Sequence, residues 1–438
     1  MRNTLKAATL ESKFPLLAVE ADCIISKDAD ITAVFEVDLP ELFTVTAAEY
    51  EAIHAAWAKA IKVLPNYTVV HKQDWFIRED YRSQTDKENL SFLSRSYEMH
   101  FNERPFLNHK CYLYLTKTTK ERMRMQSNFS SLCRGFIIPK EVDKDTTAYF
   151  LDTVGQFARI VNDTGLVRLR RLGGDEITGT EDKAGLVEKY FCLSMADTTT
   201  LEDIELGDDG LRVGDKHVSV HTLSELDALP NKVGTDCRYE RLSTDKSDCK
   251  LSFASPVGLL LSCNHLYNQY IFLDDSGENL QRFEKSARNM QSLSKYSRSN
   301  QINKEWIDLY LNDAHSFGLT SVRAHCNIIA WTDNPMEVKN MRNDVGSQIA
   351  MMECKPRHNT FIEQALCFWV EETNYRSSVS PFGLKMSDRI SGKPLHVDIS
   401  DLPMKRGVTT NRNKFVLGGS GSGKSFFKIG RASCRERV

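Results

Sequence analysis

The most constraining feature of this chain is a short glycine-rich run close to its C-terminal end. A phosphate-binding loop has the pattern Gly-x-x-x-x-Gly-Lys-Ser/Thr, which is matched by Gly418, Gly419, Ser420, Gly421, Ser422, Gly423, Lys424 and Ser425. The apolar stretch 413–417 before it predicts a strand, and such a loop forms where a strand passes into a helix. A flexible glycine and serine linker has a similar composition, but it does not need Lys and Ser at this spacing.

The residue types of this motif suit the phosphates of a nucleotide. Glycines allow the backbone to curl, so that successive N–H groups point toward the phosphate oxygens. We expect Lys424 to neutralise the β and γ phosphates of ATP and Ser425 to bind Mg²⁺, beside the positive end of a helix that begins there. ATP and Mg²⁺ are therefore the predicted cofactors, and no catalytic side chain is identified. A serine hydrolase elbow is excluded, because no serine of the run has glycine both two residues before and two residues after it.

Length and composition are those of an ordinary globular protein with more than one domain. The chain has 438 residues, whereas a single hydrophobic core stops growing at roughly 250 to 300 residues. A formal net charge of -2 gives no overall field that would attract nucleic acid or anionic lipid. The 11 cysteines include no Cys-x-x-Cys pair, which favours reduced thiols over zinc ligands. We find no secretory signal and no apolar run of the roughly 20 residues that span a bilayer, and expect a cytoplasmic protein.

The spacing of apolar residues predicts a mixed α/β fold. Strand 31–37, a helix that begins with a capping box at Thr46 and Glu49, and strand 67–70 form a unit that resembles a split β-α-β arrangement. Turns at 208–210 and 214–215 indicate a small meander. Further helices are expected at 86–104, 146–160, 278–297, 303–317, 334–349 and 360–372. Further strands are expected at 111–115, 167–170, 217–221, 257–261, 270–273, 321–332 and 393–398.

Several stretches resemble the TraG family of conjugation ATPases, which belong to type IV secretion systems. Three of them, at 373–378, 380–383 and 398–403, lead into the phosphate-loop motif. The stretches 10–17, 71–76 and 101–110 are similar to the same family, so the likeness spans nearly the whole chain. Residue by residue, only the loop 418–425 is carried over as a functional site.

The resemblance implies a cytoplasmic motor, peripheral at the inner membrane. Its N-terminal region would dock on other secretion components, and a RecA-like P-loop domain would hydrolyse ATP to drive assembly of the conjugation apparatus and DNA transfer. A homo-oligomer is expected of the full-length protein. Two readings of other classes stay open: a docking or scaffold module of the secretion machine, and a DNA-translocating coupling NTPase. Direct binding of nucleic acid is left open as well.

The resemblance also predicts how the chain is divided. We expect an N-terminal α+β domain at 1–165, a second mixed α/β part of the docking region at 166–400, and the first strand and P-loop of a RecA-like domain at 401–428. The chain is then expected to be an N-terminal fragment that ends just after the motif and hydrolyses ATP negligibly. Residues 429–438 resemble a translated sequencing adapter and are expected to be non-native. Relative to the family, a deletion is expected beside His358.

Overall fold

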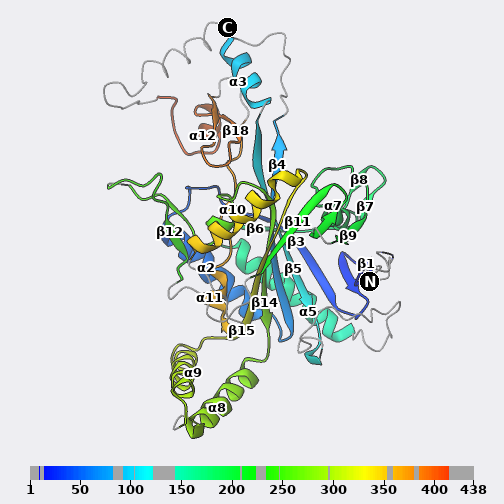
Figure 1. The fold of residues 1–438 in the computed structure, drawn as a ribbon. Coiled ribbons are helices and arrows are strands. Elements are labelled where there is room, and N and C mark those ends of the chain that lie inside the picture. The colour runs from blue at the N-terminus through cyan, green and yellow to red at the C-terminus, as the bar shows by residue number, and fades with distance from the viewer. Residues whose placement is uncertain are drawn as a thin grey trace. The chain divides into compact units, whose positions relative to one another are not determined.

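The fold is known from a computed structural model, in which two compact units are each built from separate stretches of sequence. The structure describes residues 9, 14–81, 92–102, 104–121, 144–207, 210–222, 233–245, 247–293, 296–352, 359–378 and 384–413. Unit 1 consists of Met1–Arg78 and Leu107–Thr373, and unit 2 of Glu79–Phe106 and Asn374–Val438. The chain therefore passes between the units three times. Figure 1 shows the elements in sequence colours.

Unit 1 contains a large sheet of 12 strands. Its strands follow the order β1 (Leu16–Glu20), β2 (Cys23–Ser26), β3 (Ile31–Asp38), β5 (Pro105–Lys117), β4 (Thr68–Asp80), β14 (Asn264–Leu273), β15 (Ser321–Thr332), β11 (Lys216–Thr222), β10 (Gly210–Val213) and β9 (Ile204–Gly207). Two more strands join its sides, β6 (Arg168–Arg171) on β3 and β16 (Asn359–Phe361) on β15. β14 pairs antiparallel with both β4 and β15.

The predicted split β-α-β unit is confirmed. Helix α2 (Ala47–Val63) connects β3 to β4, and β5 lies between these two strands in the sheet. The capping box is confirmed too, because Glu49 N donates to Thr46 Oγ1 at 3.3 Å and Thr46 N donates to Glu49 Oε2 at 2.7 Å. These two bonds satisfy donors that the first turn of a helix leaves without intrahelical partners. The helix ends at Val63, and Leu64 is its C-cap directly before Pro65.

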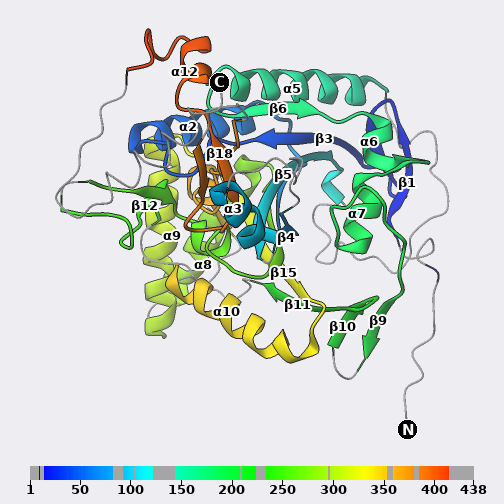
Figure 2. The same ribbon diagram turned by 90° about the horizontal axis from the view of Figure 1, so that it is seen from above.

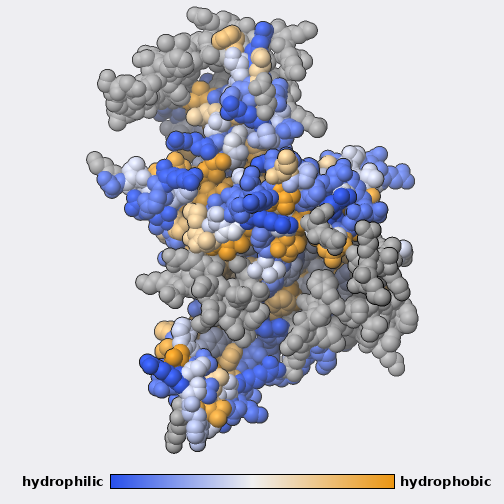
Figure 3. Space-filling model, in the orientation of Figure 1, coloured by the Kyte–Doolittle hydropathy of each residue, from blue (hydrophilic) through white to orange (hydrophobic). Residues whose placement is uncertain are grey.

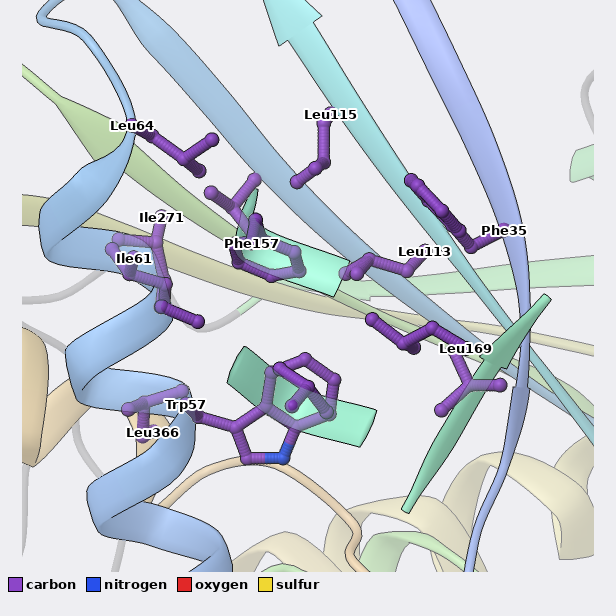
Figure 4. Packing of buried hydrophobic residues seen from close by; sticks show 14 of the residues in the cluster. Phe35, Trp57, Ile61, Leu64, Leu113, Leu115, Phe157, Leu169, Ile271 and Leu366 are labelled. Atoms are coloured by element: carbon purple, nitrogen blue, oxygen red, sulfur yellow. The ribbon is translucent and has the colours of Figure 1, made fainter. Parts of the chain in front are cut away.

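Two helices cover one face of this sheet and enclose the main hydrophobic core. α2 packs against α5 (Lys144–Asn162), and Figure 2 shows α5 running beside β6. Figure 4 shows Trp57 and Ile61 of α2 and Phe157 of α5 pointing toward Leu113 and Ile271 of the strands. The rings of Trp57 and Phe157 lie 5.9 Å apart between centroids. A second cluster forms on other strand residues, with Val34, Trp75, Leu266 and Trp331 among its buried members.

The remaining elements of unit 1 are short, apart from three helices. The long helices are α8 (Ser276–Leu293), α9 (Arg298–Phe317) and α10 (Val338–Met351). The short helices are α6 (Gly174–Thr178), α7 (Leu186–Cys192), α11 (Ile362–Leu366) and the 3-10 turns η3 (Ser255–Val257) and η4 (Pro335–Glu337). The small hairpins are β7 (Gly179–Thr180) with β8 (Lys183–Ala184), and β12 (Asp236–Arg238) with β13 (Lys250–Ser252). β9, β10 and β11 form the predicted meander.

Unit 2 contains one described helix, a hairpin and a short helical turn. These are α3 (Phe92–Asn102), the strands β17 (Leu384–Ser387) and β18 (Pro394–Val397), and α12 (Asp401–Lys405). Tyr97 OH of α3 donates to Met386 O at 2.7 Å and to Leu395 O at 3.2 Å. Lys385 Nζ lies 2.5 Å from Glu98 Oε1. These contacts fix α3 against the hairpin, although 289 residues separate Tyr97 from Met386 in the sequence.

The sequence prediction was wrong for two segments. The strand expected at 257–261 is not formed: a 3-10 turn, Ser255–Val257, is followed by further turns at 258–260, and Pro256 in the first turn has the fixed φ that suits this conformation. The helix expected at 360–372 is only Ile362–Leu366, and it is followed by turns at 367–369 and then by chain without regular secondary structure. In this segment Val370 O accepts a hydrogen bond from Lys72 Nζ of the distant strand β4, at 2.8 Å. In a continued helix the same carbonyl would bond to the backbone N–H four residues later.

The overall prediction of a mixed α/β fold is confirmed, whereas the domain boundaries stay a prediction. Strands on both sides of residue 165 share the large sheet, since β6 pairs with β3. The expected strand 413–417 lies outside the described residues, apart from Asn413. No helix in the described ranges is long and apolar enough to cross a membrane.

The packing of α5 gives a direct test of the core. Phe157 is fully buried, so Phe157→Ala should lower the free energy of unfolding by about 3–5 kcal/mol, through lost burial and the cavity that remains. Tyr149 on the same helix is 60% exposed, and Tyr149→Ala should change it by less than about 0.5 kcal/mol. Urea denaturation followed by circular dichroism measures both. Equal losses for the two variants would contradict this core.

Candidate functional site

The predicted phosphate loop, residues 418–425, lies outside the described residues. The same holds for His358 and for the tail 429–438. Nucleotide binding by Gly418 to Ser425 and Mg²⁺ binding by Ser425 therefore stay predictions from the motif. The structure does describe the chain that leads into the loop, and it also shows a buried polar cluster that sequence reasoning missed.

The hairpin before the loop has a turn that one carboxylate holds together. Asp388 Oδ1 accepts from Ile390 N at 3.1 Å, and Asp388 Oδ2 accepts from Ser391 N at 3.1 Å and from Ser391 Oγ at 2.5 Å. Gly392 completes the turn with φ at 72°, a conformation that side chains other than glycine rarely adopt. The β17–β18 hairpin is therefore closed by side-chain bonds as well as by strand pairing.

A second carboxylate directs the chain from β18 into α12. Asp398 Oδ1 accepts from Ser400 N at 2.8 Å and from Asp401 N at 3.0 Å, and Oδ2 accepts from Leu402 N at 3.0 Å. Its own backbone N–H donates to Ser378 Oγ at 2.7 Å. Asp398 thus takes the role of a helix-capping side chain, and it links two of the stretches on which the family resemblance rests.

Unit 1 contains a buried ion pair between two residues of β4. Lys72 Nζ lies 2.7 Å from Asp74 Oδ2, and both side chains are 0% exposed. Asp74 also accepts from Gln269 Nε2 at 3.0 Å, and His109 Nε2 lies 3.0 Å from Asp74 Oδ1. Alternate residues of a strand share one face, which places Lys72 and Asp74 on the same side of the sheet. Three partners from three strands, Lys72, Gln269 and His109, therefore surround the Asp74 carboxylate.

Attraction between Lys72 and Asp74 outweighs the effect of burial on the pKa of each group. Burial alone would lower the pKa of Lys72, but the Asp74 carboxylate and other nearby groups hold the pKa above its usual range. Burial likewise would raise the pKa of Asp74, yet Lys72 and His109 hold it below its usual range. Both residues are consequently charged across the ordinary pH range.

Two buried glutamates, Glu371 and Glu372, follow α11, and Glu371 lies within electrostatic reach of Lys72 and Asp74. Trp57 Nε1 donates to Glu371 Oε2 at 3.1 Å. Glu372 accepts from Tyr50 OH at 3.2 Å, from Ser252 Oγ at 2.9 Å and from Ser255 Oγ. Burial raises the pKa of Glu371 to about 8 and also raises the pKa of Glu372. Glu371 is therefore mostly protonated near neutral pH, in contrast to Asp74.

The cluster continues to the last residue of unit 1. His109 Nδ1 lies 3.0 Å from Thr373 Oγ1, Thr373 N donates to Pro40 O at 2.9 Å, and Leu42 N donates to Thr373 O at 2.9 Å. The resemblance to a known family rests partly on stretches 71–76, 101–110 and 373–378, and the structure brings their polar residues together here. The signal in the sequence was a Lys and an Asp two positions apart in a strand, between the apolar stretches 69–70 and 75–77.

The chemistry of this cluster is structural. Lys72 and Asp74 are completely buried and His109 nearly so, and each is occupied by the partners given above. A substrate would have to displace these bonds to reach them. In the described part of the chain, no group of three or more His, Cys, Asp or Glu side chains is placed to hold a metal ion.

Two family models match the chain, one near each end. Residues 3–55 match a family described as "Domain of unknown function, B. Theta Gene description (DUF3875)". Residues 383–431 match the TraG P-loop domain, and this range includes the β17–β18 hairpin, Asp398 and the phosphate-loop motif. No curated protein matches the chain.

The motif and the second match define the class as a P-loop nucleotide-binding protein. Within that class, the match supports a conjugation-related NTPase of the TraG type.

The buried ion pair gives a second test. Lys72→Met should lower the free energy of unfolding by about 3–5 kcal/mol, because it leaves the Asp74 carboxylate buried without its counter-charge. Lys62→Met is the matched control, since Lys62 pairs with Glu363 at a site 38% exposed and should cost no more than about 1 kcal/mol. The double variant Lys72→Met, Asp74→Leu should recover much of the loss. Chemical denaturation would contradict the account if the double variant were the least stable.

The buried glutamate predicts a pH dependence of stability. The folded protein keeps a proton on Glu371 up to about pH 8, whereas the unfolded chain releases it near pH 4.5. Because the folded state binds more protons in this window, the free energy of unfolding decreases as pH rises through it, by at most about 1.4 kcal/mol per pH unit. Glu371→Gln cannot ionise and should remove this decrease.

The measurement is cleanest between pH 6.5 and 8. Burial lowers the pKa of His71 and His265 to about 4, so both are neutral in the folded protein and in most of the unfolded chain above pH 6.5. Thermal and urea unfolding at several pH values would show a flatter profile for Glu371→Gln than for the wild type. Glu51→Gln, at an exposed position of α2, is the control and should leave the slope unchanged. An unaltered slope in Glu371→Gln would contradict the assignment.

Proposed function

We propose that this chain is part of a conjugation ATPase that binds Mg²⁺ and ATP at residues 418–425. The observation that carries the proposal is the match of residues 383–431 to the TraG P-loop domain, together with a complete phosphate-loop motif inside that range. Lys424 contacts the β and γ phosphates, Ser425 contacts Mg²⁺, and the backbone N–H groups of the glycines face the phosphate oxygens. ATP hydrolysis then drives assembly of the conjugation apparatus and DNA transfer.

In this proposal the two units have different tasks. Unit 2 contains the motif and the lead-in segments that Asp388 and Asp398 hold in place. Unit 1, with its large sheet, docks on other components of the secretion system at the cytoplasmic side of the inner membrane. The docking task is what the family resemblance implies, and it is consistent with central charged side chains, Lys72 and Asp74, that are enclosed and paired with one another rather than open to a substrate.

Substitutions within the motif test the proposal. In the full-length protein of which this chain is proposed to be a part, Lys424→Ala should reduce steady-state ATP hydrolysis about a hundredfold or more, because it removes the charge that stabilises the phosphate oxygens during transfer. Ser425→Ala should weaken the dependence of activity on Mg²⁺ concentration. Ser422→Ala is the matched control, since its position in the motif accepts any residue and its contact is through the backbone. Hydrolysis unchanged in Lys424→Ala would refute nucleotide binding at this loop.

A further inference from the structure

Helices α8 and α9 form a hairpin between the long strands β14 and β15. Figure 1 shows the two helices side by side, and the ring of Phe283 on α8 lies 5.1 Å from that of Tyr310 on α9. Tyr310 also stacks on Phe361 at 4.4 Å and donates from its hydroxyl to Ser321 Oγ at 2.6 Å. The half of the hairpin near the strands is therefore fixed to the sheet.

Helix α9 has apolar residues on two opposite sides. Leu311 and Ala314 are buried on the side that packs within unit 1. Ile302, Trp306 and Leu309 are 45%, 52% and 62% exposed. With 3.6 residues per turn, these three share one side of the helix, opposite Leu311.

The far half of the hairpin, where α8 ends and α9 begins, combines apolar and basic side chains. Leu293 is 50% exposed and Tyr296 is 86% exposed. In the sequence, residues 288–306 contain the basic residues Arg288, Lys295, Arg298 and Lys304 and one acidic residue, Glu305. Arg288 lies 3.6 Å from Glu284 and Lys304 lies 3.2 Å from Asp308, each as an ion pair within its own helix. The other acidic side chains of the hairpin stand closer to the strands. Figure 3 shows hydrophobic residues exposed among hydrophilic ones on this hairpin. We call the described residues 288–293 and 296–306 the hairpin tip.

We propose that the hairpin tip docks on an anionic lipid surface. Leu293, Ile302 and Trp306 enter the boundary between headgroups and acyl chains, and the basic residues of the tip contact the lipid phosphates. Exposed aliphatic residues with Trp and Tyr, next to Lys and Arg, form the composition of helices that lie in a membrane interface. Because the tip holds Arg288, Arg298 and Lys304 against Glu305, its net charge is positive and complementary to anionic lipid, whereas the strand-proximal half of the hairpin is net negative.

Single-stranded nucleic acid is the other polyanion that basic and aromatic residues can bind. Such sites hold successive bases by stacking on aromatic rings. Leu293, Ile302 and Leu309 cannot stack on bases in this way, whereas all three gain from transfer into an acyl environment. The tip therefore fits lipid better than nucleic acid. This inference deepens the proposed location at the inner membrane, and it rests on that proposal only for the identity of the membrane.

The chain carries its own reporter of insertion. Of its 5 tryptophans, Trp57, Trp75, Trp331 and Trp369 are fully buried in unit 1, and Trp306 is the one that is exposed. A change in tryptophan emission on adding vesicles therefore comes from Trp306, provided that the fold is intact. Brominated acyl chains quench only a tryptophan that reaches them.

The experiment uses the whole chain and vesicles of phosphatidylglycerol and phosphatidylethanolamine, with vesicles of phosphatidylcholine for comparison. We expect co-sedimentation with the first vesicles, weakened by added salt, together with a shift of emission to shorter wavelength and quenching by brominated lipid. Trp306→Phe should keep the binding and lose both optical signals. Equal binding to the two kinds of vesicle, or quenching that persists in Trp306→Phe, would overturn the proposal.

Substitutions in the tip distinguish the apolar from the basic contribution to vesicle binding. Leu293→Ser with Ile302→Ser should weaken vesicle binding about tenfold or more, and Arg288→Gln with Arg298→Gln several-fold at low salt. The matched control is Phe317→Ser, which removes a 73% exposed apolar residue from the other end of α9 and should change nothing. Binding to a single-stranded oligonucleotide that needs the arginines but not Leu293 and Ile302 would overturn lipid in favour of nucleic acid. Lys424→Ala should bind vesicles as the wild type does. A failure of the lipid proposal can therefore be told apart from a failure of the proposed nucleotide binding.

Discussion

The buried ion pair of Lys72 and Asp74 is the constraint on which the rest of unit 1 depends. An ion taken out of water costs several kcal/mol, and the loss is offset only when its partners are all in place. The partners here come from β14 through Gln269, from β5 through His109, and from the segment after α11 through Val370 O. A shift of β4 by one residue would turn both charges to the opposite face of the sheet. The pair therefore selects one register of the strands, even if it adds little net stability.

The same cluster gathers the three passages of the chain between the units. Asp74 stands four residues before the end of the first stretch of unit 1, and His109 stands two residues after the start of the second. Thr373, which His109 contacts, is the last residue of unit 1. Each passage is thus fixed on its unit 1 side by a bond within one network. A substitution at Asp74 should therefore affect the anchoring of all three passages at once, and not only the strand in which it lies.

Much of the fold could be predicted from the sequence, because its signals are local. The capping box at Thr46, the spacing of apolar residues in α5 and the alternation in β6 each report a single element, and all three are confirmed. The failures were segments whose conformation is set by distant partners. After α11, a bond to Lys72, nearly 300 residues away, and the bonds of the buried glutamates hold the chain in a non-helical course, which no local pattern reveals. The phosphate loop is a motif that sequence alone identified, and its geometry stays a prediction.

Three carboxylates show why residue type alone could not assign these sites. Asp74 is held ionised by a lysine, Glu371 is held protonated by burial, and Asp398 caps a helix with three backbone N–H donors. The donors around each group decide its chemistry, and those donors come from different segments. All three are buried and already bonded, so none of them is available to share Mg²⁺ with a nucleotide. The proposed contact to the metal therefore rests on Ser425 and on the phosphates themselves, as the motif implies.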